Sequence, residues 1–145
     1  MKGVSKGNAG KLFTKRNSGW FVGFFVDNDP YRHTKNLEMK WKKHQPSNKV
    51  KPFEANHSAR SMSILIKGSF LFEFKRGKLY EKVFLKKRGD YAIWLPNVEH
   101  RGYSKTKDTI MLTLRWPSLH CDHFEVTKLR RFTNSEQGGS VDRAR

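Results

Sequence analysis

The sequence predicts an all-β protein built from many short strands, arranged as a sandwich or a barrel. Apolar and polar residues alternate with period two through most of the segment from Leu37 to Trp116, which is the pattern of strands with one buried face. Turn-forming residues recur about every 8–12 positions, a spacing typical of β-sandwiches and barrels. No glycine-rich strand-to-helix motif occurs, so the sequence does not indicate a nucleotide-binding α/β fold.

The strands are expected in six segments, whose alternation assigns side chains to two faces. The second, NLEMKWKK, has Leu37, Met39 and Trp41 on one face and Glu38, Lys40 and Lys42 on the other. The long fifteen-residue segment SMSILIKGSFLFEFK breaks at Gly68 into two strands. In chain order the six segments are GWFVGFFV, NLEMKWKK, SMSILIKGSFLFEFK, KLYEKVFLKK, DYAIWLP and TIMLTLRW.

Composition divides the chain into three regions. Residues 1–18 are polar, basic and rich in Gly and Ser, as expected of a flexible N-terminal arm. Residues 19–117 form the β-rich body. Residues 118–145 form a C-terminal segment whose last residues, NSEQGGSVDRAR, have a composition typical of disorder. Asp122 followed by Glu125 is a capping-box pattern, and Val126, Leu129 and Phe132 follow at spacings of three, so a short helix is expected there.

The net charge of +17 implies attraction to anionic partners. The 30 Lys and Arg residues are spread evenly, with 11 in residues 1–50, 10 in 51–100 and 9 in 101–145. Dispersed charge favours weak, non-specific and salt-sensitive binding of nucleic acid over sequence-selective binding. No stretch reaches about 18 apolar residues, so no membrane partner is expected. The single Cys121 cannot form an internal disulfide, which suits the reducing cytoplasm.

Two glycine-bounded strands resemble the two sequence motifs of the cupin superfamily. The stretch GDYAIWLPNVEHRGY has Gly89, Pro96 and His100 at the positions of the second motif. The stretch ANHSARSMSILIKG has the strand and the glycine of the first motif. Counting back from Gly68 puts Ser61 at the glutamate position, His57 at the second histidine position and Ala55 at the first.

The resemblance implies a small cupin-type double-stranded β-helix, or jelly-roll barrel. It also raises the question of whether this chain binds a metal ion. Metal-binding cupins use two histidines and a glutamate of the first motif with the histidine of the second. This chain keeps only His57 and His100 of those four ligands, fewer than zinc or non-haem iron normally takes. No cofactor is therefore expected. The alternative is a metal-dependent enzyme of the oxygenase or isomerase/epimerase type, which would hold Fe, Zn, Mn or Ni at His57 and His100 with unconventional further ligands.

A binding pocket for a small ligand is expected at the mouth of the barrel, because barrel mouths combine apolar walls with a few polar groups. Histidine and arginine side chains there would favour an anion. Whether the protein also catalyses a reaction stays open, and each residue has a plain structural alternative as core aromatic or turn residue. The candidate ligand-binding residues are His57, Arg60, His100, Tyr103, Trp41 and Trp94.

The strand after His57 also predicts self-association. If Ser61 faces the barrel interior, Met62, Ile64 and Ile66 point to the opposite face, where three apolar side chains in a row need a cover. A second copy of the chain, related by a two-fold axis, is the expected cover. The competing cover is the chain's own apolar run around Trp20–Val26.

Overall fold

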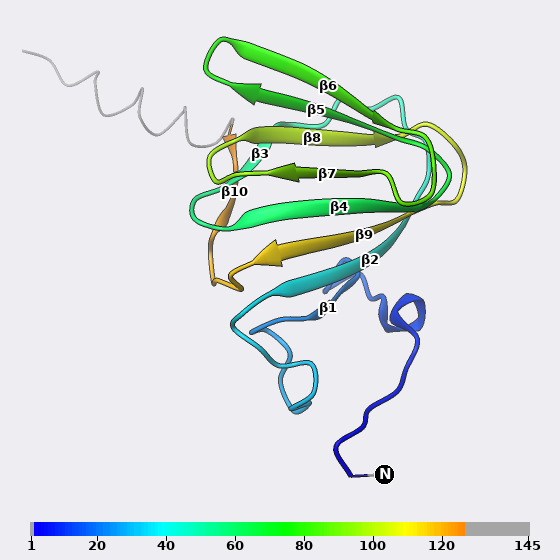
Figure 1. Cartoon of the computed structure of the whole chain (residues 1–145), viewed down its shortest axis with the longest axis vertical. Helices are drawn as coiled ribbons and strands as arrows, with labels where there is room; N and C mark the ends of the chain where they lie inside the picture. The colour runs from blue at the N-terminus through cyan, green and yellow to red at the C-terminus, as the bar shows by residue number, and fades with distance from the viewer. Residues whose placement is uncertain (1, 127–145) are drawn as a thin grey trace, which may run out of the picture.

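The computed structural model describes residues 2–126, which form two five-stranded antiparallel sheets (Figure 1). The first sheet has the strand order β1-β2-β9-β4-β7. Its strands are β1 (Trp20–Val22), β2 (Glu38–His44), β9 (Thr109–Trp116), β4 (Arg60–Lys67) and β7 (Tyr91–Trp94).

The second sheet has the order β10-β3-β8-β5-β6. The β5–β6 hairpin forms one extreme of the molecule, and β1 lies toward the other (Figure 1). The second-sheet strands are β10 (His123–Glu125), β3 (Glu54–Asn56), β8 (Glu99–Ser104), β5 (Phe70–Arg76) and β6 (Leu79–Leu85).

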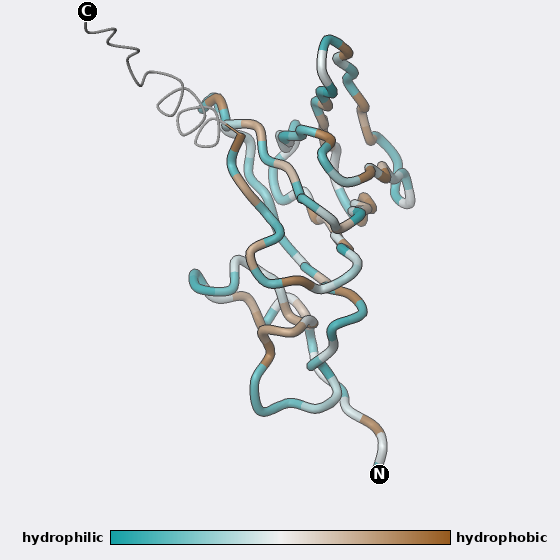
Figure 2. The backbone as a smooth tube through the Cα atoms, turned by 90° about the vertical axis from the view of Figure 1, so that its left-hand side faces the viewer, coloured by the Kyte–Doolittle hydropathy of each residue, from teal (hydrophilic) through white to brown (hydrophobic). Residues whose placement is uncertain are grey.

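Apolar side chains from both sheets meet at one end of the space between them. Hydrophobic and hydrophilic positions alternate along the backbone (Figure 2), so each strand sends every second side chain to this interior. Phe72 of β5 packs against Phe70 and against Trp94 of β7, with the Phe72 and Trp94 ring centroids 5.4 Å apart. The buried cluster consists of Leu65, Phe70, Phe72, Leu85, Ala92, Trp94 and Met111.

The turn between β4 and β5 requires glycine, as the break in the sequence pattern suggested. Gly68 has φ of +87°, in the left-handed region that side chains disfavour. A Cβ at this position would lie 2.5 Å from Thr109 Oγ1. Because Gly68 has no Cβ, the chain can turn here from β4 in the first sheet to β5 in the second without a clash against Thr109.

Strand β4 has the predicted orientation. Ser61, Ser63 and Leu65 are buried inside the barrel, whereas Met62 and the two isoleucines after it are half-buried on the outer face. The competing cover for that outer face is not formed, because β1 pairs edge to edge with β2 and lengthens the sheet instead.

Two local predictions are wrong. The apolar run from Trp20 to Val26 forms only the three-residue strand β1, because the chain turns at Gly23, where the Val26 amide bonds back to the Gly23 carbonyl. Asp122 does not cap a helix. Its carboxylate accepts from the Ser58 and Ala59 amides at 2.8 and 3.0 Å, and the next three residues pair with β3 as β10. The remainder of the predicted helix, with Leu129 and Phe132, lies outside the described residues.

Residues 9–19 lie close to the outer side of β2. A short 3-10 helix, η1 (Ala9–Leu12), places Gly10 against the Trp41 indole. The Asn17 carboxamide then organises the following turn through bonds to the Leu12 carbonyl and the Gly19 amide. Whether the 1–18 arm is dispensable stays a prediction. No helix of residues 2–126 is long and apolar enough to cross a membrane.

Candidate functional site

A cavity of about 330 Å³ lies between the two sheets, above the apolar cluster. Phe70, Phe72, Trp94 and Met111 belong to both the cluster and the cavity wall. The remaining wall is polar and mainly cationic. Its polar and charged lining residues include Lys40, Lys42, His44, Lys51, Glu54, Asn56, Ser61, Ser63, His100, Thr113, Arg115 and His123.

Strand β2 supplies the densest group of cations. Lys40, Lys42 and His44 alternate along the strand and all line the cavity. Among residues 2–126, neither lysine forms an ion pair with a carboxylate. Two ammonium groups on one strand face thus point into a confined space without direct neutralisation, which favours binding of an anion.

The Lys40 ammonium lies over an aromatic ring. Its Nζ is 5.0 Å from the centroid of the Trp20 ring, and the Arg115 guanidinium lies 4.7 Å from the same centroid. Burial lowers the pKa of Lys40 to about 8, and the like charge of Lys42 acts in the same direction. A substantial fraction of this side chain is therefore uncharged in mildly alkaline solution.

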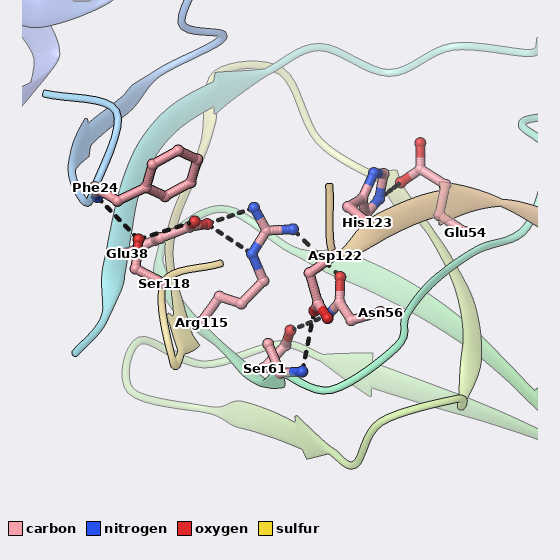
Figure 3. Close-up of polar contacts among 10 residues, drawn as sticks. Phe24, Glu38, Glu54, Asn56, Ser61, Arg115, Ser118, Asp122 and His123 are labelled. Atoms are coloured by element: carbon pink, nitrogen blue, oxygen red, sulfur yellow. Dashed lines mark hydrogen bonds and ion pairs between the residues drawn. The ribbon is translucent and has the colours of Figure 1, made fainter. Parts of the chain in front are cut away.

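Arg115 is held in place by a buried network (Figure 3). Its Nε donates to Glu38 Oε2 at 2.6 Å, its Nη2 forms an ion pair with the same carboxylate, and its Nη1 donates to Asn56 Oδ1 at 3.2 Å. Glu38 also accepts from the Ser118 hydroxyl, and Asn56 donates to Ser61 Oγ at 2.8 Å. These contacts fix Arg115 and Asn56 at the cavity wall.

Glu54 supplies a carboxylate to the cavity. It lies 3.3 Å from His123 Nε2, and this contact, with the nearby charge of Lys40, holds the pKa of Glu54 below its usual value. Lys51 donates from Nζ to the Gly102 carbonyl at 2.7 Å. Burial and the charge of Lys42 lower the pKa of Lys51. The positively charged residues of the wall thus outnumber the carboxylates.

His100 of β8 faces the cavity beside Trp94, with ring centroids 4.7 Å apart. Its Nδ1 lies 3.1 Å from the Val98 carbonyl oxygen. A carbonyl can only accept, so Nδ1 carries the hydrogen and the neutral ring has its free acceptor at Nε2. Burial lowers the pKa of His100 to about 4, which keeps the ring neutral at physiological pH.

The cavity wall also contains the His44 imidazole and the Trp94 indole. Burial, with the charges of Lys42 and Lys40, lowers the pKa of His44 to about 3, and its ring meets Phe70 edge to face at 5.1 Å. The Trp94 Nε1 is buried and has no hydrogen-bond acceptor among residues 2–126.

Two of the six sequence-predicted site residues, His100 and Trp94, reach the cavity. His57 does not join His100. Its side chain is exposed, and its ring stacks on Phe124 with centroids 4.1 Å apart. The inward positions of β3 are Glu54 and Asn56, so the alignment that put Ala55 and His57 inside was displaced by one residue, and on a strand such a displacement reverses the faces.

The other three predicted residues lie outside the cavity lining. Trp41 is on the outer face of β2, beside η1. Arg60 is exposed at the start of β4. Tyr103 is on the outer side of β8, where its hydroxyl accepts from the Lys51 amide at 3.3 Å and its ring lies 5.8 Å from the Arg101 guanidinium.

The sequence prediction missed most of the inward side chains of β2 and β9, namely Lys40, Lys42, Thr113 and Arg115. The alternation of NLEMKWKK was recognised, but its apolar face was placed inside by the general rule of burial. Alternation along a strand does not say which of its two faces is the inner one, so the sequence pattern carried no signal for these residues.

The ligands that the metal hypothesis requires do not come together in the described residues. Within residues 2–126, no three His, Cys, Asp or Glu side chains come together as a group that could hold a metal ion. His100 lines the cavity, whereas His57 does not line it and stacks its ring on Phe124. The pair named from the sequence therefore does not fit a shared ion.

Comparison with solved structures confirms the cupin-type jelly-roll fold. A mutant of the 3,4-ketoisomerase QdtA from Thermoanaerobacterium thermosaccharolyticum, in complex with TDP-4-keto-6-deoxyglucose, superposes with a TM-score of 0.59 at 11% identity, covering 82% of this chain and 95% of that one. The WlaRB TDP-quinovose 3,4-ketoisomerase from Campylobacter jejuni gives 0.55 at 15% identity, covering 63% and 71%. Oxalate decarboxylase from Bacillus subtilis gives 0.53 at 13% identity, covering 73% and 29%. The sequence matches no family model and no curated protein.

Proposed function

We propose that this protein binds a small anionic ligand in the cavity between its two sheets. The observation that carries the proposal is the pair Lys40 and Lys42, which face the cavity from one strand and form no ion pair among residues 2–126. A phosphate or carboxylate between these ammonium groups would gain charge-assisted hydrogen bonds. It would also remove their mutual repulsion.

The rest of the wall suits a ligand that is polar at one end and apolar or ring-shaped at the other. Arg115 and Asn56 provide fixed donors, and His100 provides a neutral acceptor at Nε2. Phe72 and Trp94 form the aromatic floor of the cavity. A few convergent polar groups over an aromatic floor are typical of small-ligand sites.

The comparisons support the ligand class without identifying the ligand. QdtA structures were determined with TDP and with TDP-4-keto-6-deoxyglucose, which carry an anionic diphosphate and, in the second case, a sugar. At 11–12% identity this similarity supports the fold alone. The proposal that the ligand is an anion therefore rests on the positive charge of the cavity wall. Membership of the cupin superfamily is part of the same proposal.

Titration calorimetry with inorganic phosphate and with TDP tests the proposal. We expect heat of binding from the wild-type protein and at least a tenfold weaker affinity for Lys42→Met, since one charge-assisted contact contributes about 1.5–3 kcal/mol. Lys43→Met is the matched control. Lys43 is the next residue of the same strand, points outward and pairs with Asp108 at 3.0 Å, so its loss should leave the affinity unchanged.

Equal weakening by Lys42→Met and Lys43→Met would contradict the proposal, because it would assign binding to the general surface charge. Absence of binding by the wild-type protein at millimolar phosphate and TDP would contradict it as well. The dispersed surface charge is still expected to bind nucleic acid weakly and without sequence preference.

Elemental analysis of protein purified without a histidine tag decides between this proposal and a metal-dependent enzyme. A stoichiometric amount of Fe, Zn, Mn or Ni, lost in His100→Ala, would favour the metalloenzyme. The ligands would then include His100 and groups other than His57, whose ring stacks on Phe124.

A further inference from the structure

Lys40 differs from the fixed cations of the cavity in its surroundings. The Arg115 guanidinium is bonded to Glu38 and Asn56, and the Lys51 ammonium is bonded to the Gly102 carbonyl. The Lys40 amine instead faces the Trp20 ring, 5.0 Å from its centroid, and no hydrogen-bond acceptor among residues 2–126 contacts it. An aromatic face holds an ammonium ion less firmly than a carboxylate does.

We propose that Lys40 is a nucleophilic amine that condenses with the carbonyl group of a small anionic aldehyde or ketone held in this cavity, forming an imine. This inference rests on the proposed anion-binding function and narrows its ligand to compounds that carry both an anionic group and a carbonyl.

Two features of the site favour the uncharged amine that such a reaction needs. Lys40 is enclosed by the cavity wall, and the Lys42 ammonium follows two residues later on the same strand face. Both effects act against the protonated form and bring the pKa of Lys40 to about 8. Desolvation of a lysine, or a second cation placed next to it, is a recognised way to activate this nucleophile.

The neighbours of Lys40 can hold the other end of the ligand and move protons. Lys42 and Arg115 would bind its carboxylate or phosphate, which places the carbonyl within the cavity. In the reaction the uncharged amine nitrogen attacks the carbonyl carbon, and one of its protons passes to the carbonyl oxygen. The resulting hydroxyl takes up a second proton, which comes from solvent, and leaves as water to give the protonated imine. Glu54, which lies near Lys40 at the wall, and the neutral His100 are groups that can exchange these protons.

Reductive trapping with pyruvate tests the inference. The protein is incubated with pyruvate and sodium cyanoborohydride at pH 7, and the labelled lysines are identified by peptide mass spectrometry. We expect a 1-carboxyethyl group on Lys40 at a rate about tenfold or more above that of the outward Lys43, because far more of a lysine with a pKa of about 8 is uncharged at pH 7. Lactate, with the same carboxylate and no carbonyl, should leave no label and should slow labelling by pyruvate.

Three variants separate the imine from the anion site on which it rests. Lys40→Arg keeps the charge but cannot form an imine, so it should retain phosphate binding and lose the selective label. Lys42→Met should slow the labelling of Lys40. Lys43→Met should change neither. Labelling spread evenly over surface lysines, with phosphate binding intact, would overturn the imine and leave the anion site standing. If the wild-type protein neither binds phosphate nor acquires a selective label on Lys40, both the anion site and the imine would be overturned.

Discussion

Burial alone would predict an apolar inner face and a polar outer face for the first sheet, but the chemistry of its two faces is reversed. The inner face presents Lys40, Lys42 and Arg115 to a cavity, whereas the outer face is apolar. Strand pairing aligns the outer side chains in two continuous rows across four strands. These rows are Met39, Leu114, Met62 and Ile93, and then Trp41, Leu112, Ile64 and Tyr91.

The difference shows that the interior of this barrel is divided between a core and a binding site. Only the end beside Phe72 and Trp94 is packed with apolar side chains, and the other end is left open to a polar ligand. The apolar side chains not needed inside are on the outer face, where Tyr91 and Ile93 are 61% and 52% exposed. A contiguous apolar face of this kind is typical of an interaction surface, and the homodimer predicted from the sequence would cover it.

The largest expected effect comes from placing a charge in the middle of the outer face. We expect the wild-type chain to be a dimer by light scattering at micromolar concentration, and Ile64→Glu to be a monomer, because a buried unpaired carboxylate is costly. Phe84→Glu on the β6 strand of the second sheet is the control and should remain a dimer. A wild-type monomer across a range of salt concentrations would refute this role of the outer face.

The inner face should be sensitive to loss of its buried ion pair. Glu38 is fully buried and accepts from Arg115, so Glu38→Gln leaves a buried guanidinium uncompensated. We expect the free energy of unfolding in urea to fall by about 3–5 kcal/mol. Asp108→Asn, which removes the exposed partner of Lys43, should cost about 0–1 kcal/mol. A loss below about 1 kcal/mol for Glu38→Gln would show that this network is not important for stability.

Acid should destabilise the inner face through its two histidines. His44 and His100 have pKa values of about 3 and 4 when folded, below the ordinary value near 6.5. The unfolded chain therefore binds more protons between about pH 6.5 and 4, and stability is complete above this window and declines as pH falls through it. The decline should be of the order of a few kcal/mol, measured as melting temperature against pH. His44→Phe should flatten the profile.

The smallest effect should come from the N-terminal arm beside the outer face. Deletion of residues 1–17 removes η1 and uncovers part of Trp41. Since this segment contributes no buried side chain through η1, we expect the melting temperature to shift by only a few degrees. Loss of a cooperative transition would instead make residues 1–17 part of the folded body.

Local pattern was enough to predict most strands but not the site. Strands β2, β4, β5, β6, β7 and β9 lie, to within one residue, in segments identified by alternation. Strand β8 and the short strands β3 and β10 were not predicted. In β3 and β10, three residues carry little periodicity, and their pairing joins segments about 70 residues apart. His100 was found in the cavity because its motif has a proline turn and a glycine, whereas Lys40 and Arg115 belong to no motif.

The sequence by itself determined the all-β class, the positions of the longer strands and the separation of each into two faces, since these follow from side-chain alternation within a strand. Only the tertiary structure decided which face of β2 and β9 is the inner one. Alternation is symmetric, so Lys40 inside with Trp41 outside has the same sequence pattern as the reverse. Pairing of β2 and β4 with β9 resolves this, because side chains directly opposite in a ladder lie on the same side of the sheet. The inward Ser61 and Ser63 of β4 then place Arg115 and Lys40 in the cavity with them.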